Sequence, residues 1–549
     1  MAKKFYVTTP IYYANGLPHI GHANSSFIAD FYARWKRLLG YEVKFSTGLD
    51  ENGQKMVEKA ESEGKTVKEW LDYVAQESVN IWKELQISNT DFIRTTDADH
   101  HAFVQAVLAK IHEKNVTEKE ANPDLKPEDM DMYLGNYTGL YCTGCEAFKH
   151  ARELTPEGLC PDHLTKPHEI SEENWFFNLK KYAGVFEQLW QNEPHFVEPE
   201  HRFNEVKAFV HSGLENFSIS RENKHNGIGI PLPWDENMVT YVWFDALFNY
   251  ITVCYRNGEE GKFWADDVEI LHVLGKDIVK FHATYWPAML ACAGYRQPNK
   301  EFVTGYLKVD GQGMSKTLGN VIDPVQVARE YDRDALVFYL LYDVPIGLDG
   351  DFSWERFQGT REKMLIWGRG NLVNRVTQLG KKYGVTQGKF HQEKYKDFMW
   401  GGMLDTDAWE SSASSDVAPD LLTLVRDVES TFLNSADTKP LLELRYRFVQ
   451  KANEYITKVE PWKKYKDEAT RQEAIEDLEF LLWVIKQLWL VSAPFLVNGF
   501  AVLQKILGND QISSLDSSRN GVGNWFIEAF EMKEFPVHLE PMIMYERKV

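Results

Sequence analysis

The spacing of apolar residues near the start of the chain predicts alternating strands and helices. A short apolar run at residues 5–9 precedes a turn-rich stretch, and apolar residues then recur at helical spacing until Gly40. A second apolar run covers residues 41–48, and a charged helical pattern begins near Gly53. The order strand, loop, helix, strand is typical of a doubly wound α/β sheet.

An acidic, turn-rich segment interrupts this pattern. It begins near residue 117 and leads into three clustered cysteines. Strand-like runs then return at residues 238–244, 268–275 and 301–310. We therefore predict a nucleotide-binding type of sheet that is split by an insertion.

The last third of the chain keeps a helical period. Beyond Trp354 we find no convincing strand pattern, and apolar residues recur at helical spacing over residues 361–384, 420–434, 440–459 and 477–496. These segments predict an all-α, helical-bundle C-terminal domain.

Composition and charge narrow the class of protein. With 549 residues, 44% hydrophobic and 26% charged, the chain has the composition of a folded multidomain protein. Its net charge of −20 would repel a nucleic acid unless basic residues gather locally. Five cysteines are too few for a disulfide framework and indicate a reducing compartment, and the N-terminus lacks the apolar core of a signal peptide. We expect a cytoplasmic protein with no membrane partner.

Two short motifs carry candidate phosphate chemistry. His19, Gly21 and His22 lie between the first predicted strand and helix, where backbone N–H groups and the helix dipole favour an anion. Residues 313–317 (GMSKT) follow a predicted strand and a glycine-rich turn, and the ammonium of Lys316 suits the charge that develops on a departing phosphate. Both motifs therefore point to nucleotide chemistry.

Together these motifs resemble the two signatures of class I aminoacyl-tRNA synthetases. Further segments are similar to methionyl-tRNA synthetases in the order of that family: TPIYYANGLPHIGHA, GLDENGQK, YVWFDAL, GKDIVKFHATYWPAML and EPW. The resemblance implies a Rossmann-type catalytic domain in two halves (1–116 and 226–300), a zinc-binding connective-peptide insertion (117–225), a stem-contact region with the M-S-K-T loop (301–355) and a helical-bundle anticodon-binding domain (356–549). The family's loop usually begins with lysine, where this chain has Gly313.

The clustered cysteines have the spacing of a zinc site. Cys142 and Cys145 form one C-x₂-C pair, and after fourteen residues Cys160 and His163 form a C-x₂-H pair. Three thiolates and one imidazole complete a tetrahedral set with no open position, so we predict one structural Zn²⁺ per chain.

The resemblance also implies which residues bind the substrates. Catalysis falls to His19, His22 and Lys316, and ATP binding to Gly21, Gly275, Lys276, Asp277, Ser315 and Lys316. The methionine-binding positions are Pro10, Ile11, Tyr13, Asp50, Trp243, Ala246, Leu247, Tyr250, Ile278, His282 and Trp286. For the anticodon, Asn371 and Arg375 lie four apart on one helical face and Trp462 offers a stacking plane, with lysines nearby as the local basic patch.

The implied activity is that of a methionine–tRNA ligase using ATP with Mg²⁺, L-methionine and methionine tRNA, both initiator and elongator. Because the chain stops after the predicted bundle, we expect a monomer. Three alternatives remain open: a class I synthetase for another amino acid, a small-molecule nucleotidylyltransferase that shares the H-x-G-H motif, and an inactive tRNA-binding or zinc scaffold suggested by Gly313. The insertion is too short for the editing domain typical of the valine, leucine and isoleucine enzymes.

Overall fold

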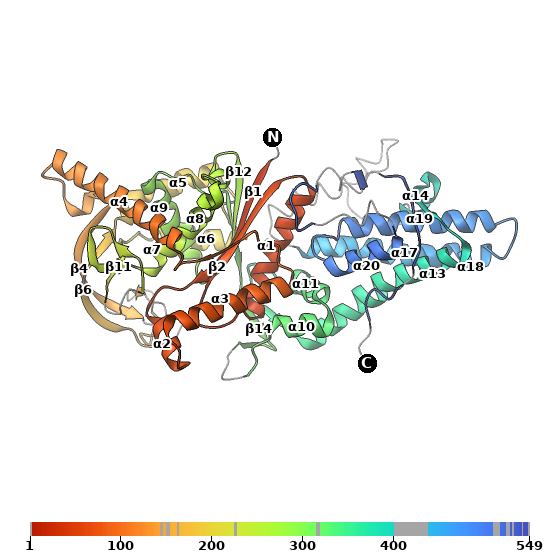
Figure 1. Ribbon diagram of the computed structural model, residues 1–549, viewed down its shortest axis with the longest axis horizontal. Helices are drawn as coiled ribbons and strands as arrows, with labels where there is room; N and C mark the ends of the chain where they lie inside the picture. Colours follow the sequence, from red (N-terminus) through yellow and green to blue (C-terminus); the bar gives the residue numbers. More distant parts are fainter. Residues whose placement is uncertain are drawn as a thin grey trace.

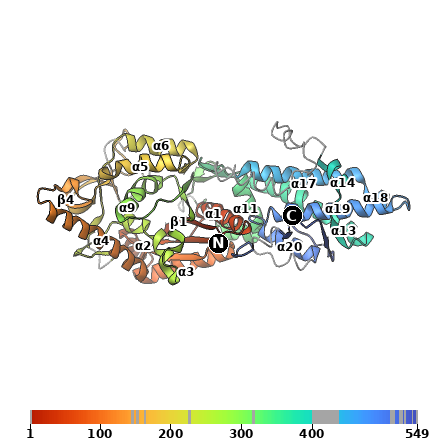
Figure 2. The ribbon, with the colours of Figure 1, turned by 90° about the horizontal axis from the view of Figure 1, so that it is seen from above.

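The computed structural model is an elongated molecule with an α/β part at one end and a helical part at the other (Figure 1, Figure 2). It describes residues 3–142, 147–149, 154–161, 164–223, 228–314, 319–399, 438–508, 517–522, 528–529, 532–540 and 542–546.

A parallel sheet of six described strands forms the centre of the α/β part, in the order β3-β2-β1-β12-β13-β7. Its strands are β1 (Lys4–Tyr13), β2 (Glu42–Asp50), β3 (Asp91–Arg94), β7 (Val197–Glu198), β12 (Val268–Gly275) and β13 (Lys300–Thr304). From β1 the sheet is extended on one side by β2 and β3 and on the other side by β12 and β13. The boundary between β1 and β12 is therefore the switch point, where open α/β sheets bind ligands at the carboxyl ends of their strands. The doubly wound sheet predicted from the sequence is confirmed.

Both faces of β1 are buried, as in a sheet covered by helices on each side. Phe5 and Val7 belong to one apolar core, which they share with α1 (Ile20–Leu38) and with helices of the C-terminal part. Tyr6 points to the opposite core, which includes α8 (Asn249–Tyr255) and α9 (Trp286–Ala293). The remaining helices of this part are α2 (Gln54–Ser62), α3 (Val67–Glu84) and α4 (Ala98–Ala121).

The residues expected to form the insertion contain an antiparallel sheet of their own, with the order β5-β4-β6-β8. Its elements are β4 (Met132–Cys142), β5 (Ala147–Lys149), β6 (His168–Phe177), β8 (Phe217–Ser218), α5 (Ala183–Asn192) and α6 (Glu200–His211). β7 lies within the range expected for the insertion but pairs with β13 in the central sheet, through Glu301 to Val197 and Phe302 to Glu198.

Two strand expectations were wrong in detail. The run at residues 238–244 does not enter the central sheet: β11 (Asp235–Thr240) pairs with β9 (Ser220–Glu222) and β10 (Pro231–Leu232), and the chain then forms α7 (Val242–Leu247). The run at residues 301–310 is divided after Thr304, and β14 (Leu307–Val309) joins a separate sheet with β15 (Gln312–Gly313) and β16 (Gly350–Phe352). Short apolar runs do not specify a partner strand.

Helices dominate the C-terminal part, as the sequence predicted. They are α10 (Pro324–Tyr331), α11 (Arg333–Tyr342), α12 (Trp354–Thr360), a π-helix η7 (Arg361–Gly370), α13 (Asn371–Tyr383), α14 (Gln392–Met399), α17 (Lys439–Val459), α18 (Pro461–Lys464), α19 (Arg471–Leu490) and α20 (Val497–Leu507). The expected helix at residues 420–434 lies outside the described residues. A small strand pair, β17 (Gln387–Lys389) with β18 (Glu534–Pro536), was not predicted. None of the described helices is both long and apolar enough to cross a bilayer.

Candidate functional site

The N-terminus of α1 presents two imidazoles whose tautomers are fixed by the backbone. The Gly21 N–H donates to His19 Nδ1 at 3.1 Å, and the His19 N–H donates to His22 Nδ1 at 3.1 Å. Because a backbone N–H only donates, both Nδ1 atoms accept, and each neutral ring carries its proton on Nε2. Two Nε2–H groups therefore lie at a helix end that favours anions.

Burial keeps His22 uncharged. Its ring stacks on His19, with centroids 3.9 Å apart, and lies 4.6 Å from the ring of Tyr12. Burial, and secondarily the neighbouring His19, lowers the pKa of His22 well below its usual value. At neutral pH His22 is a hydrogen-bond donor without a positive charge, so charge for a phosphate has to come from another residue.

The flanks of the M-S-K-T loop lie at this same helix end. A methyl group added to Gly21 would lie 3.3 Å from Met314 Cε and 2.9 Å from His19 Cε1, so the absence of a side chain allows this close approach. On the far side of the loop, the Ile322 carbonyl accepts from the Ile20 N–H at 3.1 Å. The two signature motifs, about 295 residues apart in sequence, are thus brought together.

Two predicted loop residues, Ser315 and Lys316, lie outside the described residues. Gly313, which stands where the family usually has lysine, has open space around the position of a Cβ atom. Packing therefore does not require glycine at this position.

The G-K-D segment follows β12 at the carboxyl edge of the sheet. A Cβ atom on Gly275 would come within 2.5 Å of Asp277 Oδ1, so the Asp277 carboxylate approaches the backbone closely at this turn. Lys276 pairs with Asp349 at 2.6 Å and lies 4.3 Å from the Tyr306 ring centroid. In the present geometry the ammonium of Lys276 is therefore engaged by the protein.

Most of the predicted methionine-binding residues converge beside the β1–β12 switch point. Trp243 stacks on Phe281 with centroids 4.0 Å apart and lies 6.5 Å from Tyr13 and 6.2 Å from His282. Ile11, Trp243 and Ile278 pack against the core that contains Leu247, Tyr250 and Trp286, and Ala246 is buried beside Leu247 in α7. Pro10 is buried in β1. The predicted aromatic wall is formed by contacts among these side chains.

Asp50 ends β2 at the same edge of the sheet. It is 3% exposed, it pairs in register with Tyr13 of β1, and its carbonyl accepts from the Ala14 N–H at 3.0 Å. A carboxylate at the carboxyl end of a strand beside the switch point is placed to meet a polar ligand group.

A buried hydrogen-bond network fixes the polarity of His282. Its Nδ1 donates to the Ile278 carbonyl at 3.0 Å, so its Nε2 accepts the Tyr250 hydroxyl at 2.7 Å. Burial lowers the pKa of His282 to about 4 and raises that of Tyr250. Both groups are therefore neutral over the physiological range.

Sequence reasoning missed several buried polar residues of this region. A hydrogen bond of 2.8 Å joins His272 Nδ1 of β12 to the Thr8 hydroxyl of β1. The only sequence signal for it is a histidine within the apolar run VEILHVLG. Asp245 accepts from Asn52 at 2.8 Å and from Thr240 at 3.0 Å, and burial raises its pKa to about 7. Asn52 and Asp245 lie inside the segments GLDENGQK and YVWFDAL, which could have identified them.

The zinc ligands are described only in part. Cys142 ends β4 and Cys160 lies in a tight turn, and both are buried. Thr165 connects them, because its hydroxyl lies 3.9 Å from Cys142 Sγ and its carbonyl accepts from the Cys160 N–H at 2.9 Å. Cys145 and His163 lie outside the described residues, within which no group of three metal-binding side chains occurs. Two buried thiols that share a neighbour fit the sulfur-rich set that Zn²⁺ prefers.

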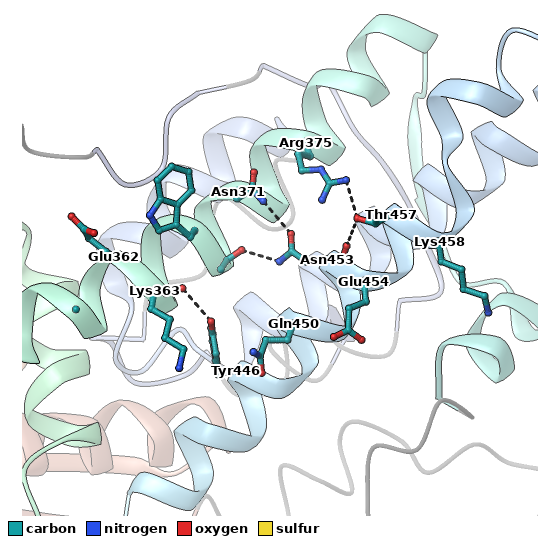
Figure 3. Close-up of a pocket in the computed structure, with 13 residues that line it drawn as sticks. Glu362, Lys363, Asn371, Arg375, Tyr446, Gln450, Asn453, Glu454, Thr457 and Lys458 are labelled. Atoms are coloured by element: carbon teal, nitrogen blue, oxygen red, sulfur yellow. Dashed lines mark hydrogen bonds between the residues drawn. The ribbon is translucent and has the colours of Figure 1, made fainter.

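Two of the three predicted anticodon residues lie along a groove between η7, α13 and α17, with a volume of about 920 Å³ (Figure 3). Asn371 and Arg375 line it from α13, and the Arg375 guanidinium lies 5.8 Å from the Trp462 ring centroid. Acidic neighbours engage part of the lysine patch next to Trp462: Lys463 pairs with Glu460 at 2.7 Å and Lys464 with Asp477 at 2.9 Å. The three predicted residues are thus brought together, with less free positive charge than expected.

Comparison with known proteins places this fold and site in a class. The family described as tRNA synthetases class I (M) matches residues 5–377. The chain is thus a class I aminoacyl-tRNA synthetase.

Its relatives specify the family within that class. The methionine–tRNA ligase of Nostoc sp. is 36% identical over 546 residues, covering 98% of this chain and 94% of that protein. The methionine–tRNA ligase of Thermosynechococcus vestitus is 40% identical over 397 residues, 71% of each protein. Among solved structures, Mycobacterium tuberculosis methionyl-tRNA synthetase in complex with methionyl-adenylate matches with a TM-score of 0.83 and 29% identity, over 99% of this chain and 100% of that one. The chain belongs to the methionyl-tRNA synthetase family.

Proposed function

We propose that the chain activates L-methionine with ATP and transfers the methionyl group to the 3′ end of methionine tRNA. A methionine carboxylate oxygen attacks the α-phosphorus of ATP, the bond to the β-phosphate oxygen breaks, and pyrophosphate leaves. The terminal ribose hydroxyl of the tRNA then takes the acyl group and AMP leaves. The observation that carries this proposal is the meeting of the two signature motifs at the N-terminus of α1, through Met314 beside Gly21 and Ile322 bonded to Ile20.

Catalysis in this proposal comes from positioning and charge stabilisation rather than a covalent intermediate. The neutral rings of His19 and His22 donate through Nε2 to phosphate oxygens, and Gly21 leaves room for the nucleotide. Lys316 supplies the positive charge for the departing pyrophosphate, which the uncharged His22 cannot supply. Mg²⁺ accompanies ATP as part of the substrate and neutralises phosphate charge. Ser315, Gly275, Lys276 and Asp277 complete the ATP site.

The apolar wall of Tyr13, Trp243 and Trp286 suits a thioether, which gains from contact with polarizable aromatic rings. Asp50 holds the ammonium group of methionine. Pro10, Ile11, Ala246, Leu247 and Ile278 complete the apolar surroundings of the methionine side chain. The hydrogen bond between Tyr250 and His282 presents a neutral surface to the sulfur.

We assign the catalytic halves to residues 1–116 and 226–300, the insertion to 117–225, the stem-contact region to 301–355 and the anticodon-binding bundle to 356–549. Asn371, Arg375 and Trp462 read the anticodon of both initiator and elongator methionine tRNA. Their arrangement supports this assignment, because the Asn371 amide and the Arg375 guanidinium line the groove and the Trp462 ring lies beside that guanidinium, and these are the groups that recognise unstacked bases.

We further propose one structural Zn²⁺ held by Cys142, Cys145, Cys160 and His163, which would join the end of β4 to the segment around Cys160. The buried thiols of Cys142 and Cys160 support it. The protein acts as a monomer in the cytoplasm, in keeping with its sparse cysteines.

The replacement His22→Ala tests the assigned catalytic role. Loss of a donor to the developing phosphate charge should slow methionyl-adenylate formation on the order of 100-fold, while the dissociation constant of methionine changes less than about threefold. Single-turnover kinetics and equilibrium binding measure the two quantities. His538→Ala, which replaces an exposed histidine near the C-terminus, serves as the matched control. Equal losses in adenylate formation and methionine binding would remove His22 from its role.

A further inference from the structure

The amide of Asn453 in α17 has a fixed orientation. Its Nδ2 donates to the carbonyls of Gly368 at 3.0 Å and Val449 at 3.1 Å. Because carbonyls only accept, the nitrogen of this amide has to face them, and its oxygen faces the other way. That oxygen accepts from Asn371 Nδ2 at 3.4 Å (Figure 3).

The π-helix η7 allows α17 to reach the Gly368 carbonyl. Gly368 lacks a side chain where a Cβ atom would lie 2.8 Å from the Tyr446 ring, so the two helices approach closely. The Tyr446 hydroxyl donates to the Lys363 carbonyl at 3.1 Å. Lys363 lies about one turn of η7 before Gly368, whose carbonyl accepts from Asn453. Irregular π-helical turns often occur at functional sites, and this one offers its carbonyls to a neighbouring helix.

Thr457 holds Arg375 in a similar way. Its hydroxyl donates to the Asn453 carbonyl at 2.9 Å, which uses its one proton. It therefore accepts from Arg375 Nη2, 3.2 Å away. The Arg375 guanidinium is thus held between this hydroxyl and the Trp462 ring, with further N–H donors left for a ligand.

These contacts determine which groups α13 presents to the groove. Asn371 is held by its nitrogen, so its oxygen is turned away from Asn453 and remains an acceptor (Figure 3). Arg375, four residues later on the same face, presents donors. An acceptor beside donors complements the Watson–Crick edge of cytosine, which has an amino donor beside two acceptors. Uracil has a carbonyl in place of that amino group and does not fit this arrangement.

We propose that Asn453 and Thr457 are positioning residues that fix the polarity of Asn371 and Arg375 for a cytosine at the first anticodon position. The inference rests on the proposed function, because the methionine codon AUG pairs with the anticodon CAU. Neither residue needs to touch the tRNA. Their part is to prevent the Asn371 amide from rotating and the guanidinium from moving.

The replacement Asn453→Leu tests the first half of the proposal, because leucine has a similar size but no acceptor. Charging is measured on two methionine tRNA transcripts, one with cytosine and one with uracil as the first anticodon base. With Asn371 free to rotate, the ratio of kcat/KM for cytosine over uracil should fall about tenfold, the effect of about one hydrogen bond. ATP–pyrophosphate exchange without tRNA should stay within about twofold of wild type. Asn374→Leu is the matched control, since Asn374 bonds Gln378, is not among the residues that line the groove and should leave the ratio unchanged.

The Thr457 variants test whether Thr457 positions Arg375, and they are expected to disturb the packing of the helices less than Asn453→Leu. Thr457→Val removes the acceptor and should raise the KM for the cytosine transcript about fivefold, with kcat nearly unchanged. Thr457→Ser keeps the hydroxyl and should restore the wild-type KM. An equal loss of kcat/KM on both transcripts in Asn453→Leu, or a serine variant as impaired as the valine variant, would overturn the inference. Absence of methionine-dependent exchange in the wild type would instead overturn the proposed function itself, since that assay contains no tRNA.

Discussion

At the scale of single residues, neutral side chains with fixed proton positions define the candidate site. The backbone determines the tautomers of His19 and His22, and the Ile278 carbonyl determines that of His282. The sequence was sufficient to select all three histidines. It could not indicate that His22 and His282 are uncharged, because burial, which depends on residues distant in sequence, lowers their pKa values.

The lowered pKa of His282 makes a testable contribution to stability. Because its folded-state pKa is about 4, below the usual 6.5, the unfolded chain binds the proton more readily and stability is lost as the pH falls below about 6.5. Between pH 7.5 and 5.5 the wild type should lose about 1 kcal/mol more unfolding free energy than His282→Gln. Urea denaturation at the two pH values measures this difference. Equal losses in both proteins would mean that His282 titrates normally in the fold.

At the scale of elements, long periodic segments were predictable and short ones were not. The strands β1, β2 and β12 and the helices α1, α17 and α19 agree with the sequence pattern because each buries a regular series of apolar residues. The run at residues 238–244 was misassigned because β-branched and aromatic residues also suit the short buried helix α7. The three-residue strands β17 and β18 are too short for any period, and the π-helix η7 has no sequence signal of its own.

The proposed zinc knuckle is a prediction at this scale. Purified protein should contain about one equivalent of Zn²⁺, and Cys145→Ser should lose most of it because tetrahedral Zn²⁺ sites need all four ligands. Elemental analysis of both proteins gives the answer. Cys254→Ser is the matched control, since Cys254 is a buried residue of α8 that donates to the Tyr250 carbonyl. A full equivalent of Zn²⁺ retained in Cys145→Ser would exclude Cys145 as a ligand.

At the scale of the whole molecule, a buried arginine connects the α/β part to the helical part. Arg333 of α11 is 2% exposed and donates to the Leu85 carbonyl at 3.0 Å, the Phe495 carbonyl at 2.8 Å and Asp30 of α1 at 3.1 Å. Burial alone would raise the pKa of Asp30, but Arg34 and Arg333 hold it below its usual value. One side chain thus joins α1, which begins at the histidines proposed as catalytic, to the bundle proposed to read the anticodon.

Arg333→Met should therefore destabilise the whole protein. Removing one member of a buried ion pair leaves Asp30 only partly compensated and costs about 3–5 kcal/mol. Arg329→Met is the control, because Arg329 lies shortly before Arg333 in the sequence and forms an exposed ion pair with Glu84. Urea denaturation should show a large decrease in unfolding free energy for Arg333→Met and almost none for Arg329→Met. Similar midpoints for both variants would show that the junction does not depend on Arg333.

We conclude that this chain activates methionine, and ATP–pyrophosphate exchange measures that step without any contribution from tRNA. The assay is run with each of the twenty amino acids separately and without tRNA. The aromatic wall around Trp243 and the motifs at the N-terminus of α1 predict exchange with methionine and none comparable with any other amino acid. Exchange with a different amino acid, or with none of the twenty, would contradict the claim.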